Sequence, residues 1–478
     1  MTENPIRVAV IGSGPAGFYA AGHLLKESGG RLEVDMLERL PTPWGLVRSG
    51  VAPDHPKIKS VTRIYEKTAE HPRFRYFGNV TFGEHVGRED LIAHYHAIVY
   101  ATGSPSDRPL GIPGEELPGS HAATDFVGWY NGHPDQCDLE IDLLSAERAV
   151  VVGNGNVAID VARMLVLAPA ELAPTDTADH ALEVLAASKV SEVVIVGRRG
   201  PAQAAFTNPE LLELGELSEA DVIVDPVELE HALAVPDVDA EANVTSRRNV
   251  EILREYASRA PKGHTKRVVL RFLLSPTELR ANPQGRLGSV ELVRNELVPA
   301  DGRLAAQATG EHETIEAGLV FRAIGYRGIP LPGVPFDERG GVIPNEGGRV
   351  VDLQTGEQVP GEYVVGWIKR GPSGVIGTNK KDAQETVDAM LADLLPDGGA
   401  PARHEPSEPD AAAVASLLRE RQPELVTYAG WSEIDRHERA LGEPAGRPRV
   451  KLTRIEEMLR VAASQSPSEE SLEQVEAG

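Results

Sequence analysis

The chain has 478 residues, of which 41% are hydrophobic and 25% charged, and its formal net charge is -24. This length predicts about two to four domains, and the negative charge disfavours nucleic acid and anionic membranes as partners. The single cysteine, Cys137, excludes an internal disulfide and a CxxC redox pair. No apolar run reaches the ~18 residues of a membrane span, and the N-terminus lacks an export pattern. We therefore expect a cytoplasmic protein without membrane insertion, and we predict no metal ligands.

The first forty residues predict a βαβ unit that binds a dinucleotide. A β-branched run, Ile6 to Ile11, precedes a glycine-rich turn, a helix from Pro15 to Leu25 and a strand from Leu32 to Leu37. The turn matches GxGxxG, whose glycines permit the tight turn, the approach of the pyrophosphate and the seating of helix on strand. The candidate cofactor-binding residues here are Gly12, Ser13, Gly14, Ala16 and Gly17.

Glu38 ends the second strand, 21 residues after Gly17. A carboxylate there accepts hydrogen bonds from ribose hydroxyls and repels a 2′-phosphate, so this unit suits FAD rather than NADP. The alternative is a solvated acid at a strand end.

A second unit of the same kind begins near residue 149. It contains a strand from Ala149 to Val152, a GxGxxA turn, a helix through about Leu167 and a strand from Val193 to Val196. Two such units imply two dinucleotides. The candidate residues of this turn are Gly153, Asn154, Gly155, Asn156 and Val157.

Arg198 and Arg199 follow this second unit, where an NAD site would have an acid. Guanidinium groups bind a 2′-phosphate through charge-assisted hydrogen bonds, so NADP is favoured. The interval from Gly155 to Arg198 is 43 residues, which implies an insertion between about 166 and 190. The alternative is a pair of surface arginines.

The remaining sequence suggests how the domains are arranged. Apolar runs at 268–273, 289–293 and 319–324 are expected to be further strands of the second domain. We predict the first part of an FAD domain at 1–107, an NADP domain at 108–326, the second part of the FAD domain at 327–395, a linker at 396–410, a helical extension at 411–465 and a disordered tail at 466–478.

Four stretches make the sequence resemble the adrenodoxin-reductase-type ferredoxin-NADP reductases, in particular the actinobacterial ferredoxin reductase A type. They are the first glycine motif, residues 41–56 (PTPWGLVRSGVAPDHP), residues 153–160 with 197–199, and residues 366–382 (GWIKRGPSGVIGTNKKD). The resemblance implies an α/β protein with two Rossmann-like dinucleotide-binding domains, one for FAD and one for NADP, of the two-dinucleotide flavoprotein type.

The resemblance also assigns roles beside the flavin. Leu46 and Val47 would contact the flavin, and His55 would act as a catalytic residue together with Glu213. From the residues themselves, His55 is restrained by the prolines on either side of it. The alternatives are a structural loop histidine and a solvated helix acid.

Trp367, Gly374, Val375 and Ile376 resemble the segment that closes the FAD site. The wider superfamily has Gly-Asp where this chain has Gly366-Trp367, so Trp367 is expected to stack on or shield the flavin. On the NADP side, the expected contacts also include Arg108, Glu210 and Gly374.

The implied activity is hydride transfer from NADPH to FAD, followed by single-electron transfer to a ferredoxin. Ferredoxins are generally acidic, and the basic segment from Arg247 to Arg271 is the candidate docking surface; the alternative is a solvated charged face. Other functions left open are the flavin module of a glutamate-synthase-like complex, a flavin monooxygenase and a flavin-binding protein without turnover.

Overall fold

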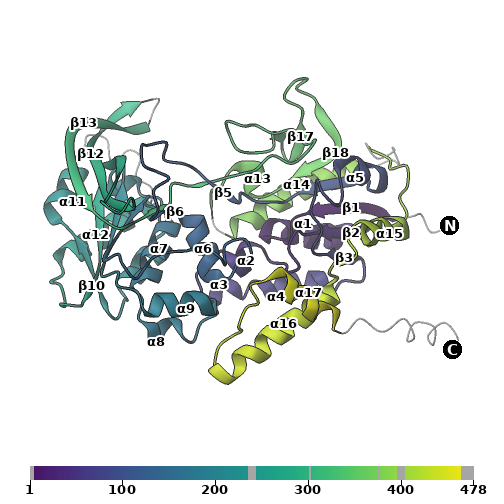
Figure 1. Ribbon diagram of the computed structural model, residues 1–478. Helices are drawn as coiled ribbons and strands as arrows, with labels where there is room; N and C mark the ends of the chain where they lie inside the picture. The colour runs from purple at the N-terminus through teal and green to yellow at the C-terminus, as the bar shows by residue number, and fades with distance from the viewer. Residues whose placement is uncertain (1–4, 235–243, 301–302, 375, 396–403, 465–478) are drawn as a thin grey trace. The chain divides into compact units, whose positions relative to one another are not determined.

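A computed structural model describes residues 5–234, 244–300, 303–374, 376–395 and 404–464 (Figure 1). The chain divides into two compact units. Unit 1 comprises residues 1–51, 55–106 and 326–478, and unit 2 comprises residues 52–54 and 107–325. Unit 1 is therefore discontinuous in sequence, and the chain leaves it at β5 (Ser106–Asp107) and returns at β15 (Tyr326–Arg327). Within the described ranges, no helix is both long and apolar enough to cross a bilayer.

Unit 1 is built on a seven-stranded sheet of order β16-β17-β18-β4-β1-β2-β3 (Figure 1). The strands from β18 to β3 are parallel, whereas β16 and β17 pair antiparallel. Parallel strands are covered on both faces, which explains why the first two are almost wholly buried. The bounds are β1 (Ile6–Ile11), β2 (Leu32–Leu37), β3 (Phe74–Phe77), β4 (Ala97–Tyr100), β16 (Asn345–Glu346), β17 (Arg349–Val351) and β18 (Gln358–Val364).

The helices of unit 1 come from both ends of its sequence. The first, α1, packs against α14 beside the sheet, and the two contribute buried side chains to one core. Pro15 is the first residue of α1, where its missing N–H costs nothing. The bounds are α1 (Pro15–Glu27), α2 (Leu46–Ser49), α3 (Pro56–Lys59), α4 (Thr62–Ala69), α5 (Arg88–His94), α13 (Trp367–Arg370) and α14 (Thr378–Leu394).

The C-terminal helices are part of the core of unit 1. Val414 and Leu418 are buried in one hydrophobic cluster, and Trp431, Ile434 and Met458 are buried in another that also contains β1 and α1. Burial of these side chains makes the extension integral to the unit. The helices are α15 (Ala411–Arg421), α16 (Tyr428–Gly442) and α17 (Ile455–Ala463). Most of the expected linker, 396–403, and the expected tail lie outside the described residues.

Unit 2 has a six-stranded sheet of order β6-β14-β7-β8-β10-β9, in which every neighbouring pair is parallel. The predicted insertion before β8 forms two short helices, α8 and α9. The strands are β6 (Ser120–Ala122), β7 (Arg148–Val152), β8 (Glu192–Gly197), β9 (Ala220–Val224), β10 (Lys266–Phe272) and β14 (Leu319–Arg322). The helices are α6 (Ala123–Asn131), α7 (Asn156–Val166), α8 (Pro169–Leu172), α9 (Asp179–Ala186), α10 (Asn208–Leu214), α11 (Pro226–Leu233) and α12 (Val244–Ser258).

Residues 289–293 form a strand of the second domain, as predicted, but this strand is not part of the domain's main sheet. They belong to a separate antiparallel sheet of β11 (Leu274–Ala281), β12 (Leu287–Ala300) and β13 (Arg303–Glu316). Exposed or half-buried residues recur along these long strands, as expected where one face of an antiparallel sheet meets solvent. An apolar run alone does not reveal which sheet a strand joins.

Candidate functional site: two glycine turns and a buried acid cluster

The first glycine turn follows β1 in unit 1 and requires glycine at two of its three glycine positions, Gly12 and Gly17. Gly12 has φ +104°, and a Cβ there would lie 2.6 Å from the Ala101 carbonyl oxygen. A Cβ on Gly17 would lie 2.2 Å from the Gly12 carbonyl oxygen. By contrast, a Cβ on Gly14 would meet no protein atom within 4 Å. The protein therefore leaves no room for a side chain at Gly12 or Gly17. The space beside the middle glycine, Gly14, is open, as the approach of a pyrophosphate requires.

Glu38 is tied to this turn. Its Oε2 accepts hydrogen bonds from the backbone N–H and the hydroxyl of Ser13, at 3.0 and 2.6 Å. Its Oε1 accepts from the N–H of Leu40 at 3.1 Å. A carboxylate has about four lone-pair sites, so both oxygens keep capacity for ribose hydroxyls.

The loop after Glu38 contains two residues predicted to contact the flavin, and these two side chains differ in burial. Leu46 is 39% exposed, whereas Val47 is only 1% exposed and belongs to the hydrophobic core of unit 1. The Val47 side chain therefore packs into this core. A ligand outside the core can contact Val47 only through its backbone. Ala16, the remaining predicted residue of the glycine motif, is likewise buried in this core.

The predicted closing segment surrounds a buried acid that the sequence analysis missed. The Gly366 N–H donates to Asp382 Oδ2 at 2.6 Å, and Lys369 Nζ lies 3.0 Å from Asp382 Oδ1. Asp382 lies on α14 and ends the quoted stretch 366–382, but it was given no role. An acid thus lies beside Gly366 although the next residue is tryptophan.

Trp367 presents an unused donor at the same place. Its indole Nε1 is buried and has no hydrogen-bond partner among the described residues, and its ring lies 5.2 Å from that of Tyr326. A buried N–H normally has an acceptor, so this orphan suits a bound group. Gly374 and Ile376 flank Val375, which lies outside the described residues.

The second glycine turn follows β7 in unit 2. Gly153 has φ +135°, and a Cβ there would lie 2.2 Å from the Ala323 carbonyl oxygen. A Cβ on Gly155 would meet only the Ala205 Cβ, at 4.0 Å. The pattern is that of the first turn, with the middle glycine open.

The polar side chains of the second turn support its backbone. Asn156 Oδ1 accepts from the Thr207 N–H at 2.8 Å. The side chain of Asn154 covers Gly197, where a Cβ would lie 2.7 Å from its amide nitrogen. Val157 is partly buried against the core of unit 2. These three side chains therefore pack against unit 2 itself.

Arg198 and Arg199 directly follow β8, beside this turn. Arg198 is exposed, and Arg199 is partly buried with one N–H donating to the Gln203 carbonyl oxygen at 3.4 Å. The insertion accounts for the long spacing without disturbing the pairing of β7 with β8, which begins at Arg148 and Glu192. Arg108 is also exposed, and its backbone N–H donates to the Gly325 carbonyl oxygen.

A cluster of acids, most of them on α7 and α10, surrounds Arg163 of α7. Arg163 forms ion pairs with Asp54, with Asp160 at 3.7 Å and with Glu213 at 3.4 Å. Burial is the largest cause that raises the pKa of Asp160; Arg163 opposes it, the carboxylates of Asp54, Glu210 and Glu213 add to it, and the net value is about 8. Asp160 therefore holds a proton at neutral pH. Only Glu213 and Glu210 had been predicted; Asp160 lies inside a quoted motif but was given no role.

His55 caps α3, and its carbonyl oxygen accepts from the N–H groups of Ile58 and Lys59. His55 belongs to unit 1 and Glu213 to unit 2, so their joint action stays a prediction. Thr378 is the first helical residue of α14, and Gly377 is its N-cap.

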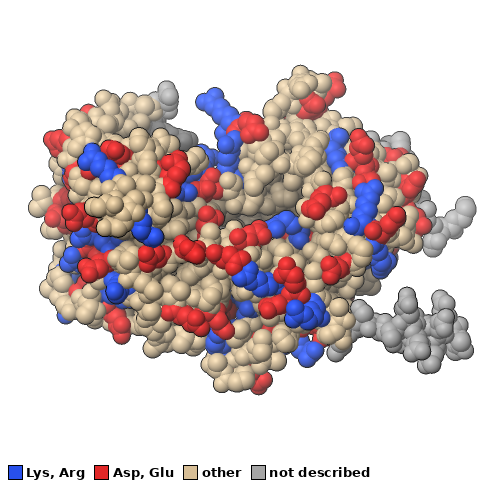
Figure 2. All heavy atoms as spheres, viewed as in Figure 1, with Lys and Arg blue, Asp and Glu red and all other residues tan. Residues whose placement is uncertain are grey.

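The basic segment is largely neutralised by local acids. Arg248 pairs with Glu251, Arg254 with Glu230, Arg259 with Glu255, Arg267 with Glu192, and Arg271 with both Glu228 and Glu313. Figure 2 shows acidic and basic side chains interspersed over the face in view. Among the described residues, Arg247 and Lys262 of this segment have no ion-pair partner.

Comparisons with known proteins agree with this geometry. Residues 6–200 match the family described as Pyridine nucleotide-disulphide oxidoreductase. The chain is 55% identical over 464 residues to the NADPH-ferredoxin reductase FprA of Mycobacterium tuberculosis, covering 96% of this chain and 99% of that one. It is 40% identical over 476 residues to the mitochondrial NADPH:adrenodoxin oxidoreductase of Arabidopsis thaliana, covering 97% and 96%. The solved structure of Mycobacterium tuberculosis FprA in complex with NADPH matches with a TM-score of 0.89 and 54% identity, covering 96% and 99%.

Proposed function

The chain belongs to the family of NADPH-ferredoxin reductases, and we propose that it takes hydride from NADPH and delivers electrons singly to a ferredoxin. Unit 1 binds FAD and unit 2 binds NADP. The observation that carries this proposal is the pair of glycine turns, one per unit, each closed against the protein and open at its middle glycine. When bound, FAD supplies the redox chemistry that links a two-electron donor to a one-electron acceptor.

The residues of unit 1 fit FAD. The open face at Gly14 admits the pyrophosphate, and the N-terminus of α1 supplies backbone N–H groups and a favourable dipole. Glu38 accepts from the ribose. The orphaned indole N–H of Trp367 gains an acceptor, and Leu46, Val47, Gly374 and Ile376 complete the lining.

The residues of unit 2 fit NADP. The turn at Gly155 admits the pyrophosphate at the N-terminus of α7, and Arg198 and Arg199 bind the 2′-phosphate. Because the Arg198 guanidinium is exposed, it can bind a phosphate without first leaving a protein partner. Arg108 contributes a further positive charge.

The acid cluster serves proton exchange at the active site. Glu213 has the more accessible carboxylate, with 35% of its side chain exposed, and its partner Arg163 is almost buried. Asp160, whose pKa is raised by burial, lies beside the same arginine and holds a proton there, and His55 is the group on unit 1 that exchanges protons with solvent. These roles rest on chemistry and placement within each unit.

Ferredoxin docks through the segment from Arg247 to Arg271. Since most of its cations are already paired, the exposed side chains of Arg247 and Lys262 carry most of the attraction. Such an attraction weakens as salt shortens the Debye length from ~10 Å at about 0.1 M. The Arg247→Glu, Lys262→Glu variant should raise the KM for ferredoxin while leaving the NADPH half-reaction unchanged.

The proposal is tested by anaerobic stopped-flow mixing of the purified protein with NADPH or NADH, followed by oxidised ferredoxin. We expect rapid bleaching of the flavin band by NADPH, slower bleaching by NADH and recovery of the band on adding ferredoxin. The Gly155→Ala variant is the matched control, because it should keep its flavin and lose the fast phase. A protein purified without flavin, or a reduced flavin that ferredoxin cannot reoxidise, would refute the proposal.

A further inference from the structure

The turn from Trp44 to Gly50 lies directly on the first glycine motif. The Trp44 N–H donates to the Ser13 carbonyl oxygen at 3.2 Å. A Cβ on Gly45 would lie 2.9 Å from the Cα of Gly14, so the two backbones are in close contact. A displacement of this turn therefore changes the surface beside the open middle glycine.

The backbone of this turn has a positive φ at Trp44, a conformation that tryptophan rarely adopts. Trp44 has φ +83° and Gly45 has φ +49°. A bulky residue at positive φ is sparsely populated and persists only where the surrounding structure holds it. The Trp44 ring packs 4.6 Å from Phe18 and 6.2 Å from Trp431 of α16. Part of what holds the turn thus comes from the C-terminal helices.

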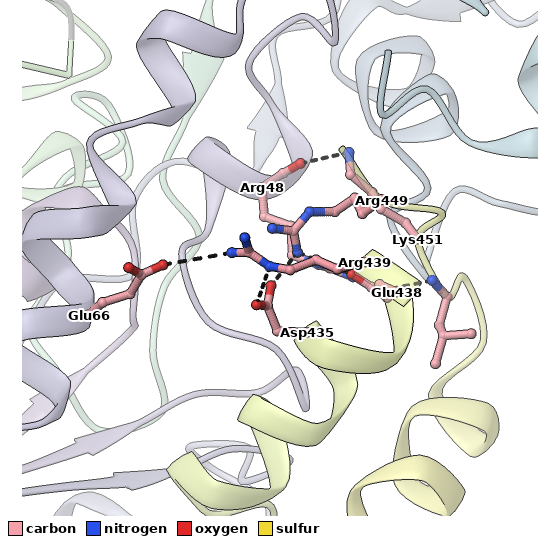
Figure 3. A network of polar contacts seen from close by, with 8 residues as sticks. Arg48, Glu66, Asp435, Glu438, Arg439, Arg449 and Lys451 are labelled. Atoms are coloured by element: carbon pink, nitrogen blue, oxygen red, sulfur yellow. Dashed lines mark hydrogen bonds and ion pairs between the residues drawn. The ribbon is translucent and has the colours of Figure 1, made fainter. Parts of the chain in front are cut away.

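Arg48, in the same turn, is held by a buried carboxylate of α16. Its two terminal nitrogens donate to Glu438 at 2.8 and 2.5 Å, and the two side chains are 8% and 0% exposed (Figure 3). A bidentate arginine–carboxylate pair fixes orientation as well as distance. The guanidinium also lies 5.4 Å from the centre of the Trp431 ring.

Further hydrogen bonds hold Glu438 and Arg48 in place. Glu438 Oε1 accepts from the Leu452 N–H at 2.9 Å, and Arg449 lies 3.3 Å from Oε2. Lys451 Nζ donates to the carbonyl oxygen of Arg48 at 3.0 Å, so the same segment also holds the backbone of the turn (Figure 3). A buried charge with a full set of partners favours one arrangement, because each alternative leaves a charge unpaired.

We propose that Glu438 is a positioning residue for the cofactor: through Arg48 it holds the turn from Trp44 to Gly50 in the one conformation that retains FAD. Residues 428–458, to which no site residue was assigned, thereby control the affinity of the site for its flavin. This inference rests on the FAD site proposed above.

The test is the rate at which the purified holoenzyme releases FAD, followed by the fluorescence of free flavin after dilution. Glu438→Gln keeps the shape and the Leu452 hydrogen bond but removes the charge that Arg48 needs. We expect release at least about ten times faster than from the unaltered protein, equivalent to about 1.4 kcal/mol, and a bound-flavin circular dichroism spectrum shifted toward free FAD. Lys451→Met, which acts on the same turn through another bond, should change both readouts in the same direction.

Glu433→Gln is the matched control. Glu433 lies on the same helix and pairs with Arg436 at 2.5 Å, away from the contacts of Glu438 and Arg449. It should release FAD at the unaltered rate. If Glu438→Gln and Lys451→Met only lower the melting temperature, with release and flavin spectrum unchanged, the inference is wrong. If Glu438→Gln does not fold, the FAD release rate and flavin spectrum of Lys451→Met decide whether the inference holds. An unaltered protein without FAD would instead contradict the proposed function.

Discussion

The backbone N–H of Gly366 donates to the carboxylate of Asp382 at 2.6 Å, so α14 supplies the acid that the Gly-Trp sequence lacks. The acid also pairs with Lys369, whose side chain is only 10% exposed. An acid 16 positions after Gly366 in the sequence thus lies within hydrogen-bond distance of its backbone.

Replacing this acid should destabilise the protein. In Asp382→Ala the buried Lys369 loses its ion-pair partner and the Gly366 N–H loses its acceptor. Breaking one partner of a buried pair costs about 3 kcal/mol, measured as the free energy of unfolding in urea. Asp388→Ala, at an exposed position of the same helix, should change it by less than about 0.5 kcal/mol. Equal effects of the two substitutions would contradict the account.

Asp160 should make stability depend on pH. Its folded pKa of about 8 lies above the ordinary value of 3.8, so the folded state binds a proton that the unfolded state has lost. Its contribution is therefore complete below about pH 4 and is lost as the pH rises to about 8, by up to about 1.4 kcal/mol per pH unit. In Asp160→Asn this loss is absent. From about pH 5 to 8, the unfolding free energy of the variant should therefore rise relative to that of the unaltered protein, and above about pH 8 the difference should level off. A difference that does not change with pH would rule out the raised pKa.

Two alanine substitutions in the first glycine turn should separate folding from binding. Gly14→Ala places its methyl group in open space at a backbone conformation that alanine adopts, so the protein should fold with an unchanged melting temperature but contain little FAD. Gly17→Ala forces a contact with the Gly12 carbonyl oxygen, so it should lower the melting temperature as well. Flavin content per chain and thermal unfolding measure the two effects. Full flavin content in Gly14→Ala would show that the pyrophosphate lies elsewhere.

Arg198→Ala should reduce the preference for NADPH over NADH. A charge-assisted hydrogen bond contributes about 1.5–3 kcal/mol, so kcat/KM for NADPH should fall about 10- to 100-fold while that for NADH stays nearly constant. Arg419→Ala, another exposed arginine, is the control. Parallel losses with both nucleotides would assign Arg198 to general electrostatics instead of the 2′-phosphate.

Local sequence determined much of the fold. The strands and helix starts around both glycine turns were predicted closely, with β1 and β2 at the predicted bounds, because a buried parallel strand and a glycine turn have strong local signatures. The family, predicted from four short stretches, was confirmed by the relatives. A run such as 289–293, however, carries no local sign of the sheet it joins, and only the structure places it in the separate antiparallel sheet.

Tertiary structure alone decided which distant charges meet. Nothing in the sequence links Arg48 to Glu438, 390 positions away, or Asp54 to Arg163, 109 positions away. Local patterns record the backbone's preferences over one turn or one strand pair, whereas the pairing of buried charges depends on how whole elements pack. The sequence by itself therefore determined the two glycine turns and the family, and only the packed chain determined the acid cluster around Arg163, the acid beside Gly366 and the charged contact that holds the turn from Trp44 to Gly50.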